Sequence, residues 1–412
     1  MSSPILYESP SGCVVLLDIP SSISSPPGLR LCSSPPPETR YVLPEPKDNS
    51  LNQSSVESTD EIRTSILEAL EHVYKNYSGP FLLPRITLEA GAKITGELDF
   101  HESVLLLQNP GPSSSLEFLN LAPEQEPAIE DVDDISDIYS APVFSESGAW
   151  RTLTILHPAP RKHFYIPPNS SFLLSDFQTS IPAFTAISTH LQKFHLVLLD
   201  PPWPNRSAAR NKTYTTLNRF DIQQLQSIPL SQTLVPPDSA SGIKGGLVGI
   251  WITNKPKFRT FVLENLFPQW GVEFVGEWIW VKITSSGEPI FDMESRMRRP
   301  YEVLVFGRAR GSVEGDGVSR HAAKERRPER GGAGGCGGCG GGVGDAVVEA
   351  FPRKTILAVP DVHSRKPCIK GLIEQYLPLE YNACEIFGRN LTEGWVTWGD
   401  EAIKYNWDGY WS

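Results

Sequence analysis

The sequence predicts an α/β protein built around a doubly wound, mostly parallel sheet. From about residue 163 onward, short apolar runs alternate with helical or loop segments, which is the pattern of alternating strands and helices. Residues 194–199 are apolar almost throughout, as expected of a strand buried on both faces, and two prolines soon follow them, which cannot continue a sheet ladder. The predicted strands are 194–199, 247–253, 274–281, 301–306, 355–359 and 384–387, with helices near 257–267 and 367–376.

The first 150 residues divide into two parts by composition. Residues 1–57 are rich in Ser and Pro, and we expect them to be mostly disordered. Residues 58–150 are expected to form a small accessory region that opens with an amphipathic helix. This helix should start at Ser58, because Ser58 and Glu61 have the spacing of a capping box and apolar residues follow at helical intervals through Tyr77.

Two further segments of the accessory region have their own pattern. Residues 104–107 are a short apolar run that resembles a strand. The stretch 124–137 is strongly acidic, and a run of like charges predicts a solvated linker.

Residues 160–405 are expected to form the catalytic domain, interrupted by an insertion at 308–350. The insertion contains a basic stretch and then a glycine tract, which cannot bury enough side-chain surface to fold. It is either a flexible nucleic-acid-binding arm or a mistranslated intron. Cys336 and Cys339 have CxxC spacing, but no second cysteine pair lies at a suitable distance, so we expect no metal site.

Composition and charge narrow the class of protein. Hydrophobic residues make up 40% of the chain, no run reaches the ~18 apolar residues of a membrane helix, and the six cysteines are scattered. A soluble intracellular protein with reduced thiols is expected. The net charge of −11 argues against a polyanionic partner, but residues 201–310 carry fourteen Lys and Arg against nine Asp and Glu. This locally basic region permits a nucleic-acid partner.

Asp200, Pro201, Pro202 and Trp203 directly follow the strand at 194–199, at the sheet edge where ligands of α/β proteins bind. The exocyclic amine of adenine is a poor nucleophile, and hydrogen-bond acceptors on its hydrogens would stabilise the charge that develops in a transition state. The Asp200 carboxylate and the Pro201 carbonyl could accept these hydrogens, while Trp203 could stack on the purine. The alternative is that Asp and Pro only terminate the strand and Trp203 is a core aromatic.

Several segments, in this order along the chain, resemble the eukaryotic N6-adenine methyltransferases with a DPPW motif, the MT-A70-like family. The segments are LLDPPW (198–203), WITN (251–254), WVKIT (280–284), RPYEVL (299–304), SRKP (364–367), FGRN (387–390) and WGDE (398–401). The resemblance covers roughly residues 160–405 and is strongest to the methyltransferase-like protein four branch. It implies a Rossmann-like, S-adenosylmethionine-dependent fold in which the catalytic motif precedes the cofactor-binding motif, a permuted order.

The resemblance also implies a set of residues for S-adenosylmethionine. Lys366 would pair with the methionine carboxylate, and Asp200 could also face the methionine amine. The residues expected along the adenine and ribose are Ser175, Asp176, Phe177, Arg389, Asn390, Asp400 and Glu401. The family usually has Asn where Asp400 stands. Asp in place of Asn removes an NH2 donor, but its carboxylate can still accept hydrogen bonds from both ribose hydroxyls.

Polar and aromatic residues beyond the motif are candidates for contact with the nucleic acid. The candidates are Asn205, Arg206, Lys212, Tyr214, Trp280 and Lys282. The alternatives are a solvated basic face for the charged residues and a core position for Trp280. For Arg298 and Arg299 the same two interpretations apply, contact with phosphates of the nucleic acid or a place on a solvated basic face.

The expected function is transfer of a methyl group from S-adenosylmethionine to the N6 amine of adenine, with no metal required. RNA is slightly favoured over DNA as the substrate. A catalytically inactive scaffold or nucleic-acid-binding subunit is the alternative, against which the intact Asp200–Trp203 motif and Lys366 argue. The substrate class suggests a nuclear location, with the cytoplasm as a second compartment.

Overall fold

The protein is described by a computed structural model of the 412-residue chain. It describes all residues except 1–2, 43–55, 88–118, 122–128, 158–159, 205–220, 239, 296–297, 312–350 and 364. Predictions made for 104–107, for the basic stretch, glycine tract and CxxC pair of the insertion, and for Asn205, Arg206, Lys212 and Tyr214 fall outside the described residues.

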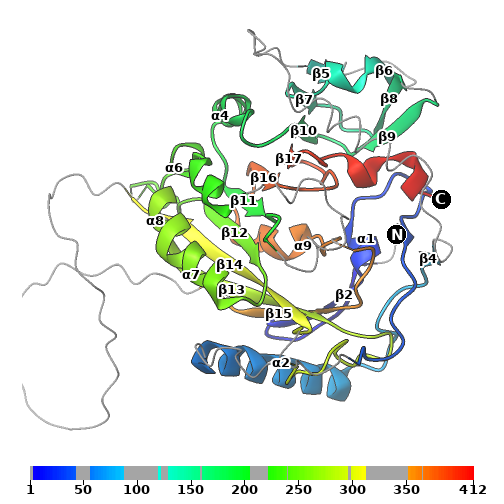
Figure 1. Cartoon of the computed structure of the whole chain (residues 1–412), viewed down its shortest axis with the longest axis vertical. Helices are drawn as coiled ribbons and strands as arrows, with labels where there is room; N and C mark the ends of the chain where they lie inside the picture. Colours follow the sequence, from blue (N-terminus) through cyan, green and yellow to red (C-terminus); the bar gives the residue numbers. More distant parts are fainter. Residues whose placement is uncertain are drawn as a thin grey trace, which may run out of the picture.

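One large mixed sheet organises the fold (Figure 1). Its order is β1-β2-β15-β13-β14-β12-β11-β16-β17-β10-β7-β5. The strands are β1 (Ile5–Glu8), β2 (Val14–Leu17), β5 (Leu119–Leu121), β7 (Pro142–Ser145), β10 (Ser171–Leu174), β11 (Leu196–Leu199), β12 (Leu247–Ile252), β13 (Val272–Lys282), β14 (Tyr301–Ala309), β15 (Lys354–Ala358), β16 (Ala383–Ile386) and β17 (Val396–Gly399).

The centre of this sheet is parallel and has a topological switch point. Strand β11 pairs in parallel with β12 on one side and with β16 on the other, and β16 pairs in parallel with β17. The chain leaves β11 toward β12 and later returns to the opposite side of β11, so the direction of winding reverses between β11 and β16. Ligands of open α/β sheets bind at the carboxyl ends of the strands at such a point. Strand β14 is antiparallel to both of its neighbours.

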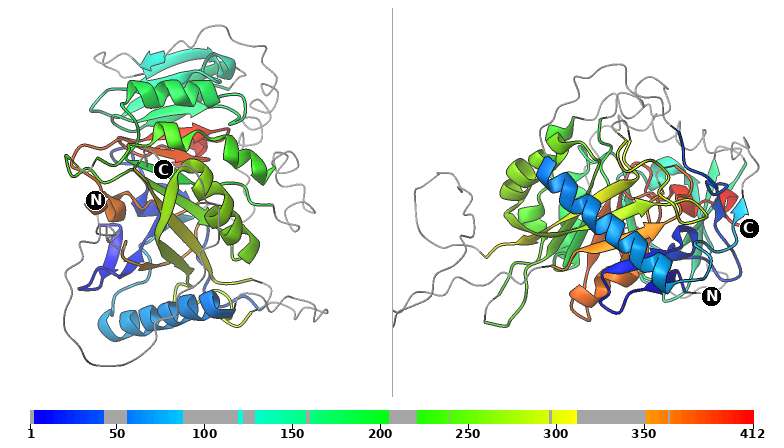
Figure 2. Two further views of the ribbon diagram at one scale, coloured as in Figure 1. Left: turned by 90° about the vertical axis from the view of Figure 1, so that its left-hand side faces the viewer. Right: turned by 90° about the horizontal axis from the view of Figure 1, so that it is seen from below.

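Helices cover both faces of the sheet. On one face pack α2 (Val56–Asn76), α4 (Ile181–His190), α6 (Leu230–Thr233), α7 (Pro256–Phe261) and α8 (Phe267–Trp270). On the other face pack α1 (Ile19–Ser22) and α9 (Lys370–Ile373). Successive side chains of β11 alternate between the two cores, Val197 and Leu199 toward the first and Leu196 and Leu198 toward the second. Figure 2 shows α2 crossing beneath the sheet.

Smaller elements complete the fold. Strands β6 (Ile129–Asp134), β8 (Arg151–His157) and β9 (Lys162–Ile166) form a second sheet. A 3-10 turn, η1 (Ile135–Asp137), directly follows β6. Strands β3 (Cys32–Ser33) and β4 (Ile86–Thr87) form a parallel pair. Further short turns are η3 (Ile222–Ser227), the π-helical η4 (Val262–Leu266), η5 (Glu374–Tyr376), η6 (Lys404–Asn406) and η7 (Asp408–Tyr410).

The α/β class, the six predicted strands and the two predicted helices are confirmed, with ends shifted by up to three residues. The predicted helix at 257–267 is a continuous run of α7, η4 and α8. The predicted start of the insertion at residue 308 is two residues too early, because residues 308 and 309 still belong to β14.

The prediction that residues 1–57 are mostly disordered is wrong for the described residues 3–42. They form β1, β2, α1 and β3, and β2 pairs in parallel with β15 in the central sheet. The Ser/Pro composition hides this because Val15, Leu16 and Leu17 are almost completely buried, and their burial stabilises an otherwise polar segment. Because α2 also packs on this sheet, the N-terminal regions join the same body as the expected catalytic domain.

Two details of the accessory region also differ from the prediction. The helix begins at Val56, two residues before the predicted start at Ser58. Part of the acidic stretch is strand β6 and not a linker. Asp131 and Asp133 alternate with Val132 along this strand and are exposed, so like charges are tolerated on its solvent side.

Candidate active site

Charged residues gather where the central strands end. Asp176 follows β10, Asp200 follows β11, and Asp400 and Glu401 follow β17. Lys282 ends β13, and Lys366 lies in the segment between β15 and α9. Because the carboxyl ends of parallel strands share one edge of the sheet, these residues from distant parts of the chain meet at the switch point.

Lys366 is the centre of the first group of ion pairs. Its Nζ donates to Asp200 Oδ1 at 2.9 Å and to Oδ2 at 3.0 Å. The same Nζ lies 3.1 Å from Glu302 Oε2, and Lys282 Nζ lies 2.5 Å from Glu302 Oε1. Two lysines therefore alternate with two carboxylates in a chain that runs from β13 to β11.

Arg389 forms the second group. Its Nε donates to Glu401 Oε2 at 2.6 Å, and Lys404 Nζ donates to Glu401 Oε1 at 2.8 Å. Arg389 Nη1 lies 3.7 Å from Asp200 Oδ2, which joins the two groups. Asp200 thus has a cation on either side.

Burial and neighbouring charges shift the pKa values of these acids in opposite directions. Burial alone would raise the pKa of Glu302, but Lys282 and Lys366 outweigh it and lower the pKa to about 2. Burial raises the pKa of Glu385 to about 7, assisted by the charge of Asp200. Burial and the adjacent Glu401 carboxylate raise the pKa of Asp400 to about 7. Acids with separated pKa values in one site are typical of functional centres.

The turn after β11 is held firmly. Asp200 N donates to Ile386 O of β16 at 3.2 Å, and Trp203 N donates to Pro201 O at 2.8 Å. Proline fixes its own φ, so Pro201 and Pro202 make the turn rigid. The bond from Trp203 occupies one of the two lone pairs of the Pro201 carbonyl and leaves the other as a possible acceptor for a substrate.

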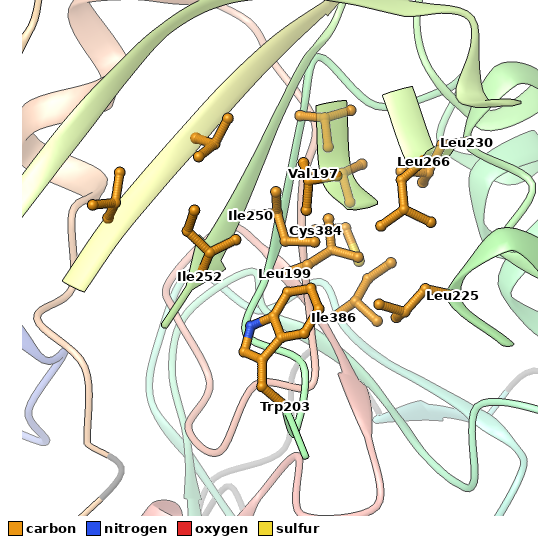
Figure 3. Close-up of a cluster of buried hydrophobic side chains, with 14 of the residues drawn as sticks. Val197, Leu199, Trp203, Leu225, Leu230, Ile250, Ile252, Leu266, Cys384 and Ile386 are labelled. Atoms are coloured by element: carbon orange, nitrogen blue, oxygen red, sulfur yellow. The ribbon is translucent and has the colours of Figure 1, made fainter. Parts of the chain in front are cut away.

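Trp203 belongs to the core and not to an open surface. Its side chain is 7% exposed, its Nε1 donates to Trp251 O at 2.6 Å, and its ring centroid lies 4.6 Å from that of Phe258. Figure 3 shows Trp203 beside Leu199 and Ile386 in this cluster. This is the position of a core aromatic, the alternative interpretation of the sequence, and not that of an exposed platform for a base.

A small cavity lies between the two groups of ion pairs. Its volume is about 30 Å³, and Asp200, Lys366, Glu385, Arg389 and Asn390 are among the residues that line it. Pockets for small molecules commonly measure about 300–1,000 Å³, so a cofactor would require its walls to move.

The donors and acceptors around the cavity suit S-adenosylmethionine. Lys366 could bind a carboxylate, while Asp200 and Glu385, which also line the cavity, could accept from an amine. Arg365 also lines the cavity, and its Nε and Nη2 are buried without a hydrogen-bond partner among the described residues. Its Nη1 is already paired with Asp361, so Nε and Nη2 are the part of the guanidinium that a hydrogen-bond acceptor on a ligand could bind.

The structure brings most of the predicted cofactor residues to this edge but gives some of them other partners. Ser175 is completely buried, and its hydroxyl donates to Ser180 Oγ at 2.6 Å, so its side chain faces the protein interior. Asp176 N donates to Tyr139 Oη at 3.1 Å. The ring of Phe177 contacts that of Phe387 edge to face, with centroids 5.4 Å apart.

The predicted substrate residue Trp280 is 3% exposed and packs in the second core with Trp251. This position agrees with the core interpretation and not with direct contact to a base. Lys282 covers the ring with its Nζ 4.7 Å from the centroid, and its side chain is 24% exposed.

Two residues of the site were missed in the sequence. Glu302 lies inside the RPYEVL segment and links both lysines. Glu385 is the one charged residue of the apolar strand β16. A carboxylate in a strand predicted to be buried on both faces is a signal that could have found Glu385.

The class of protein follows from the placement of these residues. The reversal of winding at β11 brings a rigid Asp-Pro-Pro-Trp turn and a chain of alternating acids and cations to the one sheet edge where α/β proteins bind ligands. Together these features define an α/β protein with a charged ligand-binding site at the carboxyl edge of its sheet, a placement typical of α/β enzymes.

Comparison with known proteins identifies the family. The MT-A70 family model matches residues 194–325 and 340–401. The chain is 32% identical to the N6-methyladenosine RNA methyltransferase MTA1 of Pyricularia oryzae, over 98% of this chain and 95% of that protein. It is 30% identical to MTA1 of Cryphonectria parasitica, over 99% of this chain and 94% of that protein. The chain therefore belongs to the MT-A70 family.

A third relative confirms the branch inferred from the sequence. Human N(6)-adenine-specific methyltransferase METTL4 is 32% identical over 65% of this chain and 48% of that protein. Among the described residues no helix is long and apolar enough to cross a membrane, and no group of three or more metal-ligating side chains occurs.

Proposed function

We propose that this protein transfers a methyl group from S-adenosylmethionine to the N6 amine of adenine in RNA. The observation that carries the proposal is the position of Asp200 at the switch point, in a rigid turn and between two cations. The fungal relatives that match almost the whole chain are named as N6-methyladenosine RNA methyltransferases, which supports RNA over DNA.

S-adenosylmethionine would supply an electrophilic methyl group on a sulfonium. In the transfer, a bond would form between N6 and the methyl carbon as the bond from sulfur to that carbon breaks and leaves a neutral thioether, and N6 would release one proton to solvent. Lys366 would hold the methionine carboxylate and Asp200 or Glu385 the methionine amine. Asp400 and Glu401, at the end of β17, would accept from the ribose hydroxyls.

Asp200 and the turn after it would orient the adenine. The carboxylate and the free lone pair of the Pro201 carbonyl would accept the two N6 hydrogens, which directs the nitrogen lone pair toward the methyl group. Acceptors fixed in advance stabilise the positive charge that develops on N6 without reorganising during the reaction. Trp203 acts by holding the turn through its bond to Trp251 O and its contact with Phe258.

The nucleic acid would approach over the locally basic part of the chain. Lys255 and Lys257 lie next to Phe258, and Lys255 Nζ donates to Pro204 O at 3.1 Å, directly after the catalytic turn. Cations beside the site would contact phosphates, which gives affinity without sequence preference. We also propose a nuclear location, which rests on the substrate class and can be tested by imaging the tagged full chain.

The test is transfer of labelled methyl from S-adenosylmethionine to RNA and DNA oligonucleotides of the same sequence. Wild type, Asp200→Ala and Asp238→Ala are compared, the last being a control that removes an exposed carboxylate in a loop. We expect N6-methyladenine in RNA with wild type and the control, and a loss of about 100-fold or more with Asp200→Ala. Faster methylation of the DNA oligonucleotide than of the RNA would show that DNA, not RNA, is the substrate. Binding of RNA without transfer would support an inactive scaffold subunit instead.

A further inference from the structure

The segment that carries Lys366 is held in place by the N-terminal part of the chain. Between the end of β15 at Ala358 and the start of α9 at Lys370, the described residues form neither helix nor strand. We call residues 359–368 the lysine loop. A loop without its own ladder of backbone hydrogen bonds needs other partners to keep one conformation.

Arg85 supplies partners at the start of the lysine loop. Its Nη2 donates to Val359 O at 2.9 Å, and its Nη1 donates to Pro360 O at 2.9 Å and to Ser34 O at 3.2 Å. One guanidinium therefore binds two consecutive carbonyls of the loop and a third carbonyl from the N-terminal segment. The planar fork of arginine suits this task, which a lysine ammonium could not perform with the same geometry.

Asp361 and Arg365 supply partners in the middle of the lysine loop. Ser34 N donates to Asp361 Oδ1 at 3.0 Å, and Arg365 Nη1 donates to Asp361 Oδ2 at 2.6 Å and to Cys32 O at 2.8 Å. Both side chains of this ion pair are fully buried. Strand β3 thus contacts Arg365 through Cys32, and Ser34, the residue after β3, contacts Asp361.

The far end of the lysine loop is fixed in the same way. Cys368 N donates to Ser22 Oγ at 3.0 Å, at the end of α1. The Arg365 guanidinium lies 4.4 Å from the ring centroid of Tyr405, whose hydroxyl donates to His363 O at 3.2 Å. Contacts from residues 22–34 and from Arg85 therefore surround Lys366 on both sides along the chain.

The family model begins at residue 194, so these N-terminal contacts lie outside it. We propose that residues 22–34 and Arg85 form a clamp that positions Lys366 for cofactor binding, with Arg85 as the positioning residue. The role of Lys366 in this inference rests on the proposed function. The clamp itself is a property of the fold and can be tested separately.

The first experiment measures amide hydrogen exchange in full-length wild type, Arg85→Ala, Arg85→Lys and Arg40→Ala. Arg40 is a matched control because it lies in the same N-terminal region and pairs on the surface with Glu288, at 3.5 Å. We expect faster exchange in the lysine loop with Arg85→Ala, a smaller effect with Arg85→Lys, and no change there with Arg40→Ala. Unchanged exchange of the lysine loop in Arg85→Ala would overturn the clamp.

The second experiment measures the Kd of labelled S-adenosylmethionine by equilibrium dialysis in a double-mutant cycle of Arg85→Ala and Lys366→Ala. If Arg85 acts through Lys366, Arg85→Ala should weaken binding about tenfold in wild type and less than about twofold in the Lys366→Ala background. Equal effects in both backgrounds would show that Arg85 does not act through Lys366. If wild type binds no S-adenosylmethionine, the proposed function fails, while hydrogen exchange still decides whether the clamp exists.

Discussion

Lys366 and Asp200, which are 166 residues apart in the chain, form a two-pronged ion pair at the switch point of the sheet, with Nζ at 2.9 and 3.0 Å from the two carboxylate oxygens. The same ammonium also neutralises Glu302. One cation thus keeps two carboxylates from β11 and β14 close together. Replacement of Lys366 would leave these acids facing each other, and this geometry leads to the first prediction.

Lys366→Met should reduce methyl transfer by about 100-fold or more and destabilise the fold at neutral pH by about 3 kcal/mol, since two partly buried acids lose their shared cation. Lowering the pH toward 5 should recover part of the stability, because loss of the Lys366 charge raises the pKa of Glu302 and protonation of Glu302 removes the repulsion. Denaturant unfolding of the variant and of wild type at pH 7 and pH 5 measures this. An equal loss of unfolding free energy at pH 7 and at pH 5 would contradict the prediction.

Glu302 should make the folding stability of the wild type decrease at acidic pH. Its folded pKa of about 2 lies below its ordinary value of 4.5, so its stabilisation is complete above pH 4.5 and is lost as the pH falls toward 2. The full effect is about 3 kcal/mol. Glu302→Gln should be less stable at pH 7 and should lose less stability than wild type between pH 5 and pH 3. If the unfolding free energies of wild type and Glu302→Gln change equally between pH 5 and pH 3, this prediction is wrong.

Asp400 should make cofactor binding depend on pH near neutrality. Its pKa of about 7 means that part of the unbound protein holds it protonated, whereas only the carboxylate accepts from both ribose hydroxyls. Binding therefore favours the ionised form, and the KM for S-adenosylmethionine should fall as the pH rises from 6 to 8. The amide of Asp400→Asn does not titrate, so its KM should depend less on pH over this range, and the dependence that remains should come from Glu385. A variant with the same pH dependence as wild type would exclude Asp400 as the cause.

Trp203→Phe should separate a packing role from a stacking role. Phenylalanine keeps an aromatic contact with Phe258 but leaves the buried Trp251 carbonyl without its donor, which should cost about 1–3 kcal/mol. The KM for the oligonucleotide should change little, because the ring is buried in the core and not exposed for stacking on a base. A large rise in that KM with an unchanged melting temperature would show that Trp203 binds the adenine instead.

Local patterns were enough to predict the central strands and the catalytic turn. The apolar run before Asp200 is a strand because its side chains reach both cores, and the prolines after it end the strand. The same reasoning failed for residues 3–42, because Val15, Leu16 and Leu17 are too short an apolar run to stand out in a Ser/Pro-rich segment. Their strand exists because β15 and β1 supply partners on both sides.

The sequence by itself determined the α/β class, the order of the motifs and the candidate residues Asp200, Lys366, Arg389 and Glu401. Asp200 follows from residue types at the end of a predicted strand, whereas Lys366, Arg389 and Glu401 are implied by the resemblance of short segments to the family. Only the tertiary structure decided that Glu302 joins the two lysines, that Trp203 is buried, and that Ser34 and Arg85 hold the lysine loop. Ser34 and Asp361 are 327 residues apart, and a contact of that range depends on how the whole sheet packs.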